Sequence, residues 1–159
     1  HLAWGYHDQA PLIAWSIKLA TALLGHTEIA VRLPSILSMT VVSAYLVLIA
    51  RRWVGPRAAW HTALLTQGIL LFNVGGLLAT ADGLQAAGWA GATYHVARGY
   101  EKGAWRQWIT GGLWFGLGLL SKYTMILFLP GAFLYGLLAA RHRPHLAGKL
   151  LGTARHELL

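Results

Sequence analysis

The residues of this sequence that could do chemistry are few, because only five are Asp or Glu and 13 are Lys or Arg. Asp82 and Asp8 are the acids whose carboxylates could take a proton from a hydroxyl group, as a general base does. Lys122, with Tyr123 next to it, and Arg32 could bind the oxygens of a phosphate group, for which lysine acts as a point charge. Together these residues indicate a site for a phosphate-bearing ligand.

Asp8, with His7 beside it, could be a residue of a solvated loop or the N-cap of a helix. A metal site needs more ligands than one carboxylate and one imidazole, and no further ligand set is recognisable. These residues by themselves do not indicate a metal site. The sequence contains no cysteine, which excludes disulfides, thiolate metal sites and cysteine nucleophiles.

The same residues also have structural explanations, which stay open at this point. Asp82 could favour the dipole at the start of a helix that Thr80 caps. Arg32 could pair with Glu28, which precedes it by one helical turn. Lys122 could be an interfacial lysine that reaches toward the lipid headgroups.

The elements that position these residues are predicted to be membrane helices. Hydrophobic residues make up 56% of the chain and charged residues 11%, against about 25% charged residues in an average soluble domain. A helix needs roughly 17–25 apolar residues to cross a bilayer. Five uncharged runs come close to or reach that length, so we expect an all-α bundle of about five spans, at residues 33–50, 58–81, 83–97, 107–121 and 123–140.

Small residues four positions apart predict where these helices pack closely. Gly88 with Ala92, and Gly112 with Gly116, form such pairs. Pairs of this kind let two helix backbones approach each other in a membrane and carry no chemistry themselves.

The basic residues predict the orientation of the bundle. Ten of the 13 Lys and Arg residues follow the first, third and fifth spans, so alternating spans place them all on one side. The positive-inside rule makes that side cytoplasmic. The basic residues therefore lie in separate loops between spans and do not form one water-facing surface. This argues against nucleic acid as a partner in spite of the net charge of +8.

Residues 1–32 fall on the opposite, external side, as do Asp82 and Lys122 at the ends of spans. Residues 12–24 are apolar with one lysine and too short to span comfortably. We expect a helix that lies in the outer interface, although a tilted span remains possible. Pro11 suits the first turn of that helix and Gly25 its end.

The whole chain, 1–159, is interpreted as part of one transmembrane domain. Residues 1–32 form its external loop and interfacial helix, residues 33–140 its spans, and residues 141–159 a basic cytoplasmic segment. The chain begins with His and an external hydrophilic stretch without a signal peptide. We therefore expect a piece of a longer membrane protein.

Four blocks of sequence resemble the membrane glycosyltransferases that use a polyprenyl-phosphate sugar. This superfamily includes the dolichyl-phosphate-mannose protein mannosyltransferases and the aminoarabinose transferases of lipid A. The blocks are WGYHDQAPLIAW, GHTEIAVRLPSIL, ATADGLQAAGWA and GLLSKYTMILFLPG, in that order over residues 4–131. Three residues depart from the family pattern. Ala10 and Ala81 stand where prolines are usual, and Gln9 stands where a basic residue or His is common.

The resemblance implies an integral protein of a bacterial inner (plasma) membrane with its site on the external face. The donor would be a sugar on a polyprenyl phosphate, and the acceptor a hydroxyl group of a lipid, glycan or protein. Lys122, Tyr123 and Arg32 would hold the lipid phosphate, and Asp82 or Asp8 would act in catalysis. In some relatives the position that matches Asp8 is acidic and contacts a metal ion, so the resemblance leaves a divalent metal ion open as a cofactor. A further catalytic acid would lie upstream of this chain.

Two other classes stay open. A transporter or flippase-like subunit would carry ionisable residues deep within its spans, along a path. A membrane anchor without catalytic activity would need no charged residues at span ends. Transfer of a polyprenyl-linked sugar distinguishes the enzyme from both.

Overall fold

The structure, a computed structural model, describes residues 11–142. All regular elements in this part of the chain are helices, which confirms the all-α fold. They are α1 (Leu12–Leu24), α2 (Glu28–Trp53), α3 (Pro56–Gly68), α4 (Leu70–Leu77), α5 (Ala81–Lys102), α6 (Trp105–Ser121), the short 3-10 helix η1 (Tyr123–Leu127) and α7 (Phe128–His142).

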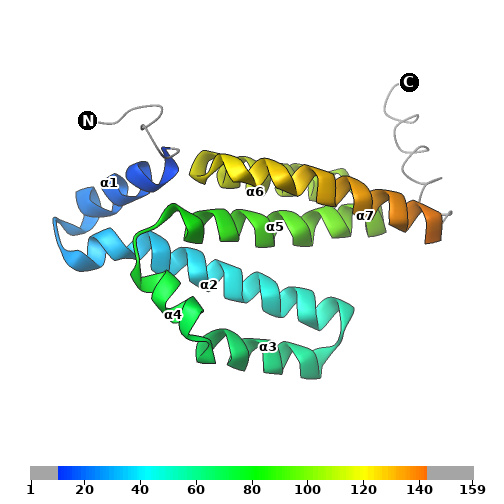
Figure 1. Ribbon diagram of the computed structural model, residues 1–159, viewed down its shortest axis with the longest axis horizontal. Helices are drawn as coiled ribbons and strands as arrows, with labels where there is room; N and C mark the ends of the chain where they lie inside the picture. Colours follow the sequence, from blue (N-terminus) through cyan, green and yellow to red (C-terminus); the bar gives the residue numbers. More distant parts are fainter. Residues whose placement is uncertain (1–10, 143–159) are drawn as a thin grey trace.

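The helices form an antiparallel bundle with α5 near its centre (Figure 1). Helix α5 packs between α2 and α6, and α7 contacts α5 as well. Helices α3 and α4 cover another side of α2, and α1 lies across the beginning of α2. Helix α2 meets the length and composition of a membrane span, with a mean hydropathy of 2.0 over 18 residues, and it is the one such helix in the described part of the chain. The number of spans therefore stays a prediction.

The second predicted span, residues 58–81, is interrupted in the structure. Helix α3 ends and α4 begins at Ile69, whose extended backbone (φ −77°, ψ 118°) breaks the helix. The side-chain amide of Asn73 donates to the carbonyl oxygens of Gln67 (2.9 Å) and Ile69 (3.3 Å), and the Phe72 N–H also donates to the Ile69 oxygen (3.1 Å). The break is therefore satisfied by a side chain from the next turn, and α4 turns away from the line of α3 (Figure 1).

The helix predicted at residues 12–24 is confirmed as α1, with the same bounds. Pro11 precedes it, and the Trp15 N–H donates to the Pro11 carbonyl oxygen at 3.1 Å. Gly25 ends it with φ 75°, a backbone conformation that favours glycine. Thr27 then caps α2, because its hydroxyl oxygen accepts a hydrogen bond from the Ala30 N–H at 3.2 Å.

One end of the bundle collects the basic residues. Helices α2, α5 and α7 end there, and α3 and α6 begin there (Figure 1). We call it the basic end; its described Lys and Arg residues are Arg51, Arg52, Arg57, Arg98, Lys102, Arg106 and Arg141. The predicted grouping of the basic loops on one side is therefore confirmed for this part of the chain, whereas the side of the membrane stays a prediction.

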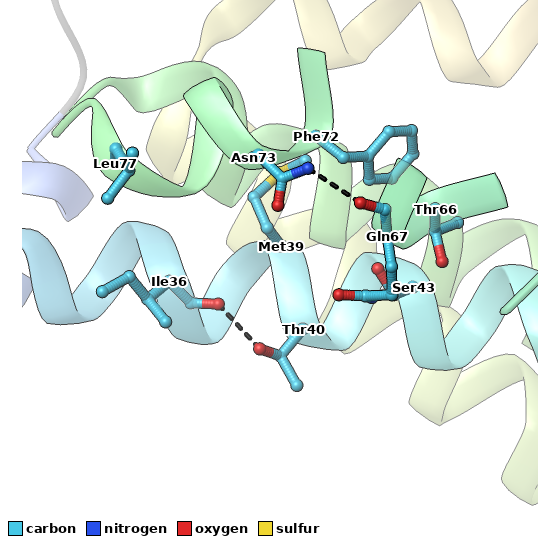
Figure 2. Close-up of a pocket in the computed structure, with 9 residues that line it drawn as sticks. All are labelled: Ile36, Met39, Thr40, Ser43, Thr66, Gln67, Phe72, Asn73 and Leu77. Carbon is cyan, nitrogen blue, oxygen red and sulfur yellow. Dashed lines mark hydrogen bonds between the residues drawn. The ribbon is translucent and has the colours of Figure 1, made fainter. Parts of the chain in front are cut away.

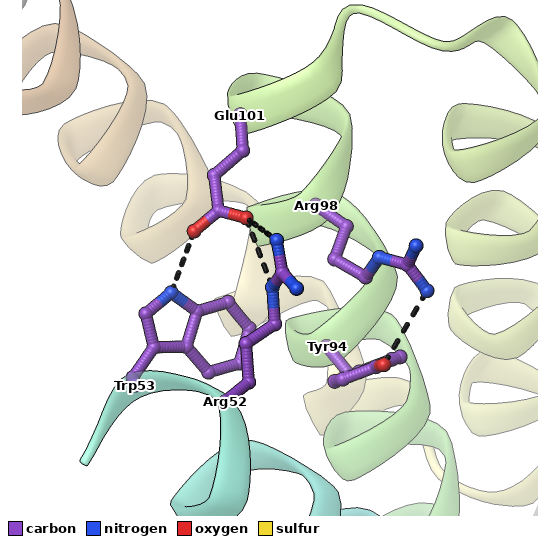
Figure 3. Close-up of polar contacts among 5 residues, drawn as sticks. All are labelled: Arg52, Trp53, Tyr94, Arg98 and Glu101. Carbon is purple, nitrogen blue, oxygen red and sulfur yellow. Dashed lines mark hydrogen bonds and ion pairs between the residues drawn. The ribbon is translucent and has the colours of Figure 1, made fainter. Parts of the chain in front are cut away.

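A carboxylate at the basic end ties α2 to α5. Glu101 accepts hydrogen bonds from Arg52 Nε (3.0 Å) and Arg52 Nη2 (2.6 Å) on one oxygen and from Trp53 Nε1 (2.7 Å) on the other (Figure 3). Hydrogen bonds that involve an ionised group are stronger than neutral ones. This contact joins the last turn of α2 to the last turn of α5.

Candidate functional site

The candidate site lies at the end of the bundle opposite the basic end, where α5 begins and α6 ends. Lys122 Nζ donates a hydrogen bond to Asp82 Oδ1 at 2.6 Å. These two residues were proposed separately from the sequence, as a phosphate-binding cation and as a catalytic carboxylate. The structure brings them into one ion pair, although 40 positions separate them in the chain.

Local backbone structure explains why Lys122 points at α5. Lys122 follows the last residue of α6 and has an extended backbone (φ −158°, ψ 130°), so it lies outside both α6 and η1. On one side of it, the buried Ser121 hydroxyl donates to the Ala81 carbonyl oxygen at 2.6 Å. On the other side, the Gln85 amide donates to the Thr124 hydroxyl oxygen at 2.7 Å. Two hydrogen bonds thus hold the Lys122 turn against the first turns of α5.

The electrostatics of the pair are those of a partly exposed contact. The side chains of Lys122 and Asp82 are 41% and 66% exposed. The hydrogen bond to Asp82 and the attraction of its carboxylate raise the pKa of Lys122 above its ordinary value. Exposed ion pairs contribute little to folding stability, so stability alone does not account for the arrangement. Both groups remain accessible to a ligand.

Thr80 precedes α5 as expected of a capping residue, but its side chain makes no capping hydrogen bond among the described residues. Asp82 lies in the first turn of α5, where a negative charge interacts favourably with the helix dipole. The dipole explanation for Asp82 therefore survives beside the functional one, whereas capping by Thr80 does not.

The remaining predicted residues are not gathered into this pair. Arg32 forms an ion pair with Glu28 on its own helix at 3.6 Å, the structural explanation offered from the sequence. Tyr123 begins η1 directly after Lys122, and its side chain is exposed. Asp8 lies outside the described residues. Within residues 11–142, no group of three or more His, Asp or Glu side chains could hold a metal ion.

An apolar groove begins at Asp82. It has a volume of about 450 Å³ and runs between α2 and α5. Its lining extends from Asp82 along α5 through Trp89 to Thr93, with Val42, Leu46 and Ile49 on the α2 side. We call it the α2–α5 groove. A charged group at its mouth and apolar walls along its length suit an amphipathic ligand with a polar head and a hydrocarbon tail.

Sequence reasoning did not find a chain of polar side chains that crosses the bundle. Tyr45 Oη and His95 Nε2 lie 3.1 Å apart, and His95 Nδ1 and Gln107 Oε1 lie 2.9 Å apart. The contacts join α2, α5 and α6. The amide oxygen of Gln107 can only accept, so His95 donates to it through Nδ1. No residue spacing along the chain indicates these contacts.

The helical bundle thus holds a charged pair beside an apolar groove, and its helix α2 has the length and composition of a membrane span. A family model of dolichyl-phosphate-mannose-protein mannosyltransferases matches residues 8–154, which is nearly the whole chain. The chain belongs to that family and is a membrane glycosyltransferase of the mannosyltransferase type. No curated protein and no solved structure matches it.

Proposed function

We propose that this protein transfers a sugar from a polyprenyl-phosphate donor to a hydroxyl group of a lipid, glycan or protein acceptor. The observation that carries the proposal is the Lys122–Asp82 ion pair at the mouth of the α2–α5 groove. The transfer would take place at this end of the bundle, on the external face of a bacterial inner membrane. The basic loops at the other end support this orientation through the positive-inside rule. Membership of the mannosyltransferase family supports the reaction class.

The pair gives each partner a role in the reaction. The donor's phosphate oxygens compete with the Asp82 carboxylate for Lys122, because both are anions within reach of the same ammonium group. Binding of the phosphate therefore frees the carboxylate. Asp82 then accepts the proton of the acceptor hydroxyl group while the oxygen of that hydroxyl group attacks the anomeric carbon of the donor sugar. The bond between that carbon and the phosphate oxygen breaks, and polyprenyl phosphate leaves with its charge stabilised by Lys122.

The other predicted residues enter the proposal around this pair. Tyr123 would donate its phenolic hydroxyl to the same phosphate, and Arg32 would add a second cation once it leaves Glu28. Asp8, or an acid upstream of this chain, is the alternative proton acceptor, and Asp8 would also be the ligand of a divalent metal ion if one takes part. The polyprenyl tail would lie along the apolar walls of the α2–α5 groove.

The test is transfer of labelled mannose from synthetic mannosyl polyprenyl phosphate by the full-length protein in proteoliposomes. We expect release of polyprenyl phosphate together with acceptor-bound label, and loss of both in the Asp82→Asn and Lys122→Ala variants. Lys18→Ala removes another exposed lysine, on α1, and serves as the matched control. Movement of the intact labelled lipid across the bilayer without release of polyprenyl phosphate would instead establish the transporter or flippase class.

A further inference from the structure

A second pocket lies beside the interruption between α3 and α4. Its volume is about 490 Å³; it is open on one side and is lined by α2, by the end of α3 and by α4 (Figure 2). In a membrane, non-helical backbone occurs where protein covers it or where it lines a polar cavity. The break at Ile69 thus coincides with the kind of cavity that such a break requires. We call this cavity the helix-break pocket.

The polar groups of the helix-break pocket can both donate and accept hydrogen bonds. The hydroxyls of Thr40 and Thr66 donate to carbonyl oxygens of their own helices, at 2.9 and 3.0 Å, which leaves their oxygen lone pairs for a ligand. The amide nitrogen of Asn73 is engaged at the break, which leaves its carbonyl oxygen. Ser43 and the amide of Gln67 also line the pocket and can donate (Figure 2).

Charge and shape narrow the ligand class. None of the described residues that line the helix-break pocket is charged, so nothing there would offset the burial of a phosphate or carboxylate. The ring of Phe72 forms part of the wall among the hydroxyl and amide groups (Figure 2). A neutral ligand with many hydroxyl groups and an apolar ring face satisfies both kinds of lining. A sugar has this chemistry.

The pocket is separate from the α2–α5 groove. Thr40 and Ser43 face the pocket, whereas Val42 and Leu46 face the groove. At about 100° per residue, the two sets of side chains leave α2 about a third of a turn apart. The first turn of α5 lies close to both α2 and α4: a Cβ atom on Gly83, the neighbour of Asp82, would lie 3.7 Å from Ser38 Cβ and 4.0 Å from the Gly75 carbonyl oxygen.

We propose that the helix-break pocket binds a neutral sugar of the acceptor while the donor occupies the α2–α5 groove. The assignment to the acceptor rests on the proposed function, because it takes the groove at Asp82 as the donor's place. The binding of a neutral sugar rests on the pocket itself.

The first experiment tests sugar binding without any transfer. The printed chain has no cysteine, so Ser43→Cys in a cysteine-free full-length protein provides a single reporter. We expect a small water-soluble thiosulfonate to label it, and methyl α-mannopyranoside to slow the labelling while glycerol phosphate does not. His26→Cys, in the exposed turn between α1 and α2, should react equally in all three solutions. Absence of labelling at residue 43, or labelling that no neutral glycoside slows, would overturn the proposal.

The second experiment distinguishes the acceptor from the donor. Thr40→Val and Ser43→Ala remove pocket hydroxyls with little change of shape, and each should raise the KM for the acceptor roughly two- to tenfold, the effect of one neutral hydrogen bond. The KM for the donor should not change. Thr110→Val, which removes a similar hydroxyl from α6, is the control. A rise confined to the donor KM would overturn the acceptor assignment. If no variant and no wild-type protein transfers sugar, the proposed function is refuted. The labelling experiment then still shows whether the helix-break pocket binds a neutral sugar.

Discussion

Gly88 of α5 and Gly118 of α6 lie in direct backbone contact. A Cβ atom added to Gly88 would lie 2.7 Å from the Cα atom of Gly118, closer than real Cβ atoms approach. Gly88 and Ala92 therefore form the close-packing pair that their spacing predicts, and Ala92 is fully buried. The prediction for α6 was wrong, because a Cβ atom on Gly112 or Gly116 would meet nothing within 4 Å.

The first prediction compares two glycines. Gly88→Ala should destabilise the protein by about 1–3 kcal/mol, because the added methyl group meets backbone that cannot turn aside. Gly112→Ala should be neutral or stabilising by about 0.5–1 kcal/mol, since alanine favours the helix and the space is open. Unfolding by a denaturing detergent measures both. Equal effects of the two substitutions would contradict the backbone contact between Gly88 and Gly118.

Lys122→Ala should weaken use of the donor much more than it weakens expression or membrane insertion. The expected rise in donor KM is about one to two powers of ten, as for loss of a charge-assisted hydrogen bond. Lys122→Arg should recover part of the loss, because the charge survives with a different geometry. Transfer rates against donor concentration give the result. Unchanged donor dependence in the alanine variant would make Lys122 an interfacial lysine.

Asp82 is predicted to matter more for turnover than for folding. Asp82→Asn keeps the shape of the side chain but removes the base, so turnover should fall about 10²-fold or more. A combined Asp82→Lys and Lys122→Asp protein separates the ion pair from its proposed roles. It restores opposite charges at the same two positions, so it should insert and fold normally and yet remain inactive. Recovery of transfer in this protein would show that the pair is only structural.

The raised pKa of Lys122 predicts how its contribution to stability depends on pH. A lysine with a higher pKa in the folded than in the unfolded state stabilises the fold fully below the unfolded pKa, and the effect disappears as the pH rises through the folded pKa. The difference in unfolding midpoint between wild type and Lys122→Met should therefore be constant from about pH 7 to about pH 9 and decline above roughly pH 10.4. A difference that declines already between neutral pH and about pH 9 would contradict the pair.

The basic end is predicted to face the cytoplasm. A cysteine introduced at Lys102, the last residue of α5, should react with a membrane-impermeant reagent only after the cells are opened. A cysteine at His26, at the other end of the bundle, should react in intact cells. Labelling of residue 102 in intact cells would reverse the orientation, and with it the assignment of the site to the external face.

What the sequence could predict was local. Helix α1 was predicted with its correct bounds, because Pro11 and Gly25 are strong boundary signals. The Glu28–Arg32 pair was predicted because residues four apart on a helix are neighbours. The break at Ile69 was missed, since the run from 58 to 81 contains neither charge nor proline. Gly68 precedes the break and Asn73 follows it. Neither residue predicts the break until the hydrogen bonds from the Asn73 amide to the Gln67 and Ile69 carbonyl oxygens are known.

Contacts between distant segments could not be predicted in the same way. Asp82 and Lys122 were identified by residue type and place at span ends, but their ion pair depends on the rotation of α5 against α6. A small change in the rotation of either helix about its own axis would separate the two side chains. The same reason explains the error at Gly112 and Gly116: their spacing is right for close packing, but they lie on the wrong face of α6.

The interruption at Ile69 has a consequence for the surrounding bilayer. Helix α2, with 26 residues, is about 39 Å long, whereas α3, with 13 residues, reaches only about 20 Å before the chain turns. The hydrocarbon layer is about 30 Å thick, so the two neighbouring helices match it unequally. Lipids beside α3 would therefore shorten or tilt to keep its apolar surface covered. The protein would thus carry a locally thinned membrane along this flank, which shortens the distance from the water phase to the helix-break pocket.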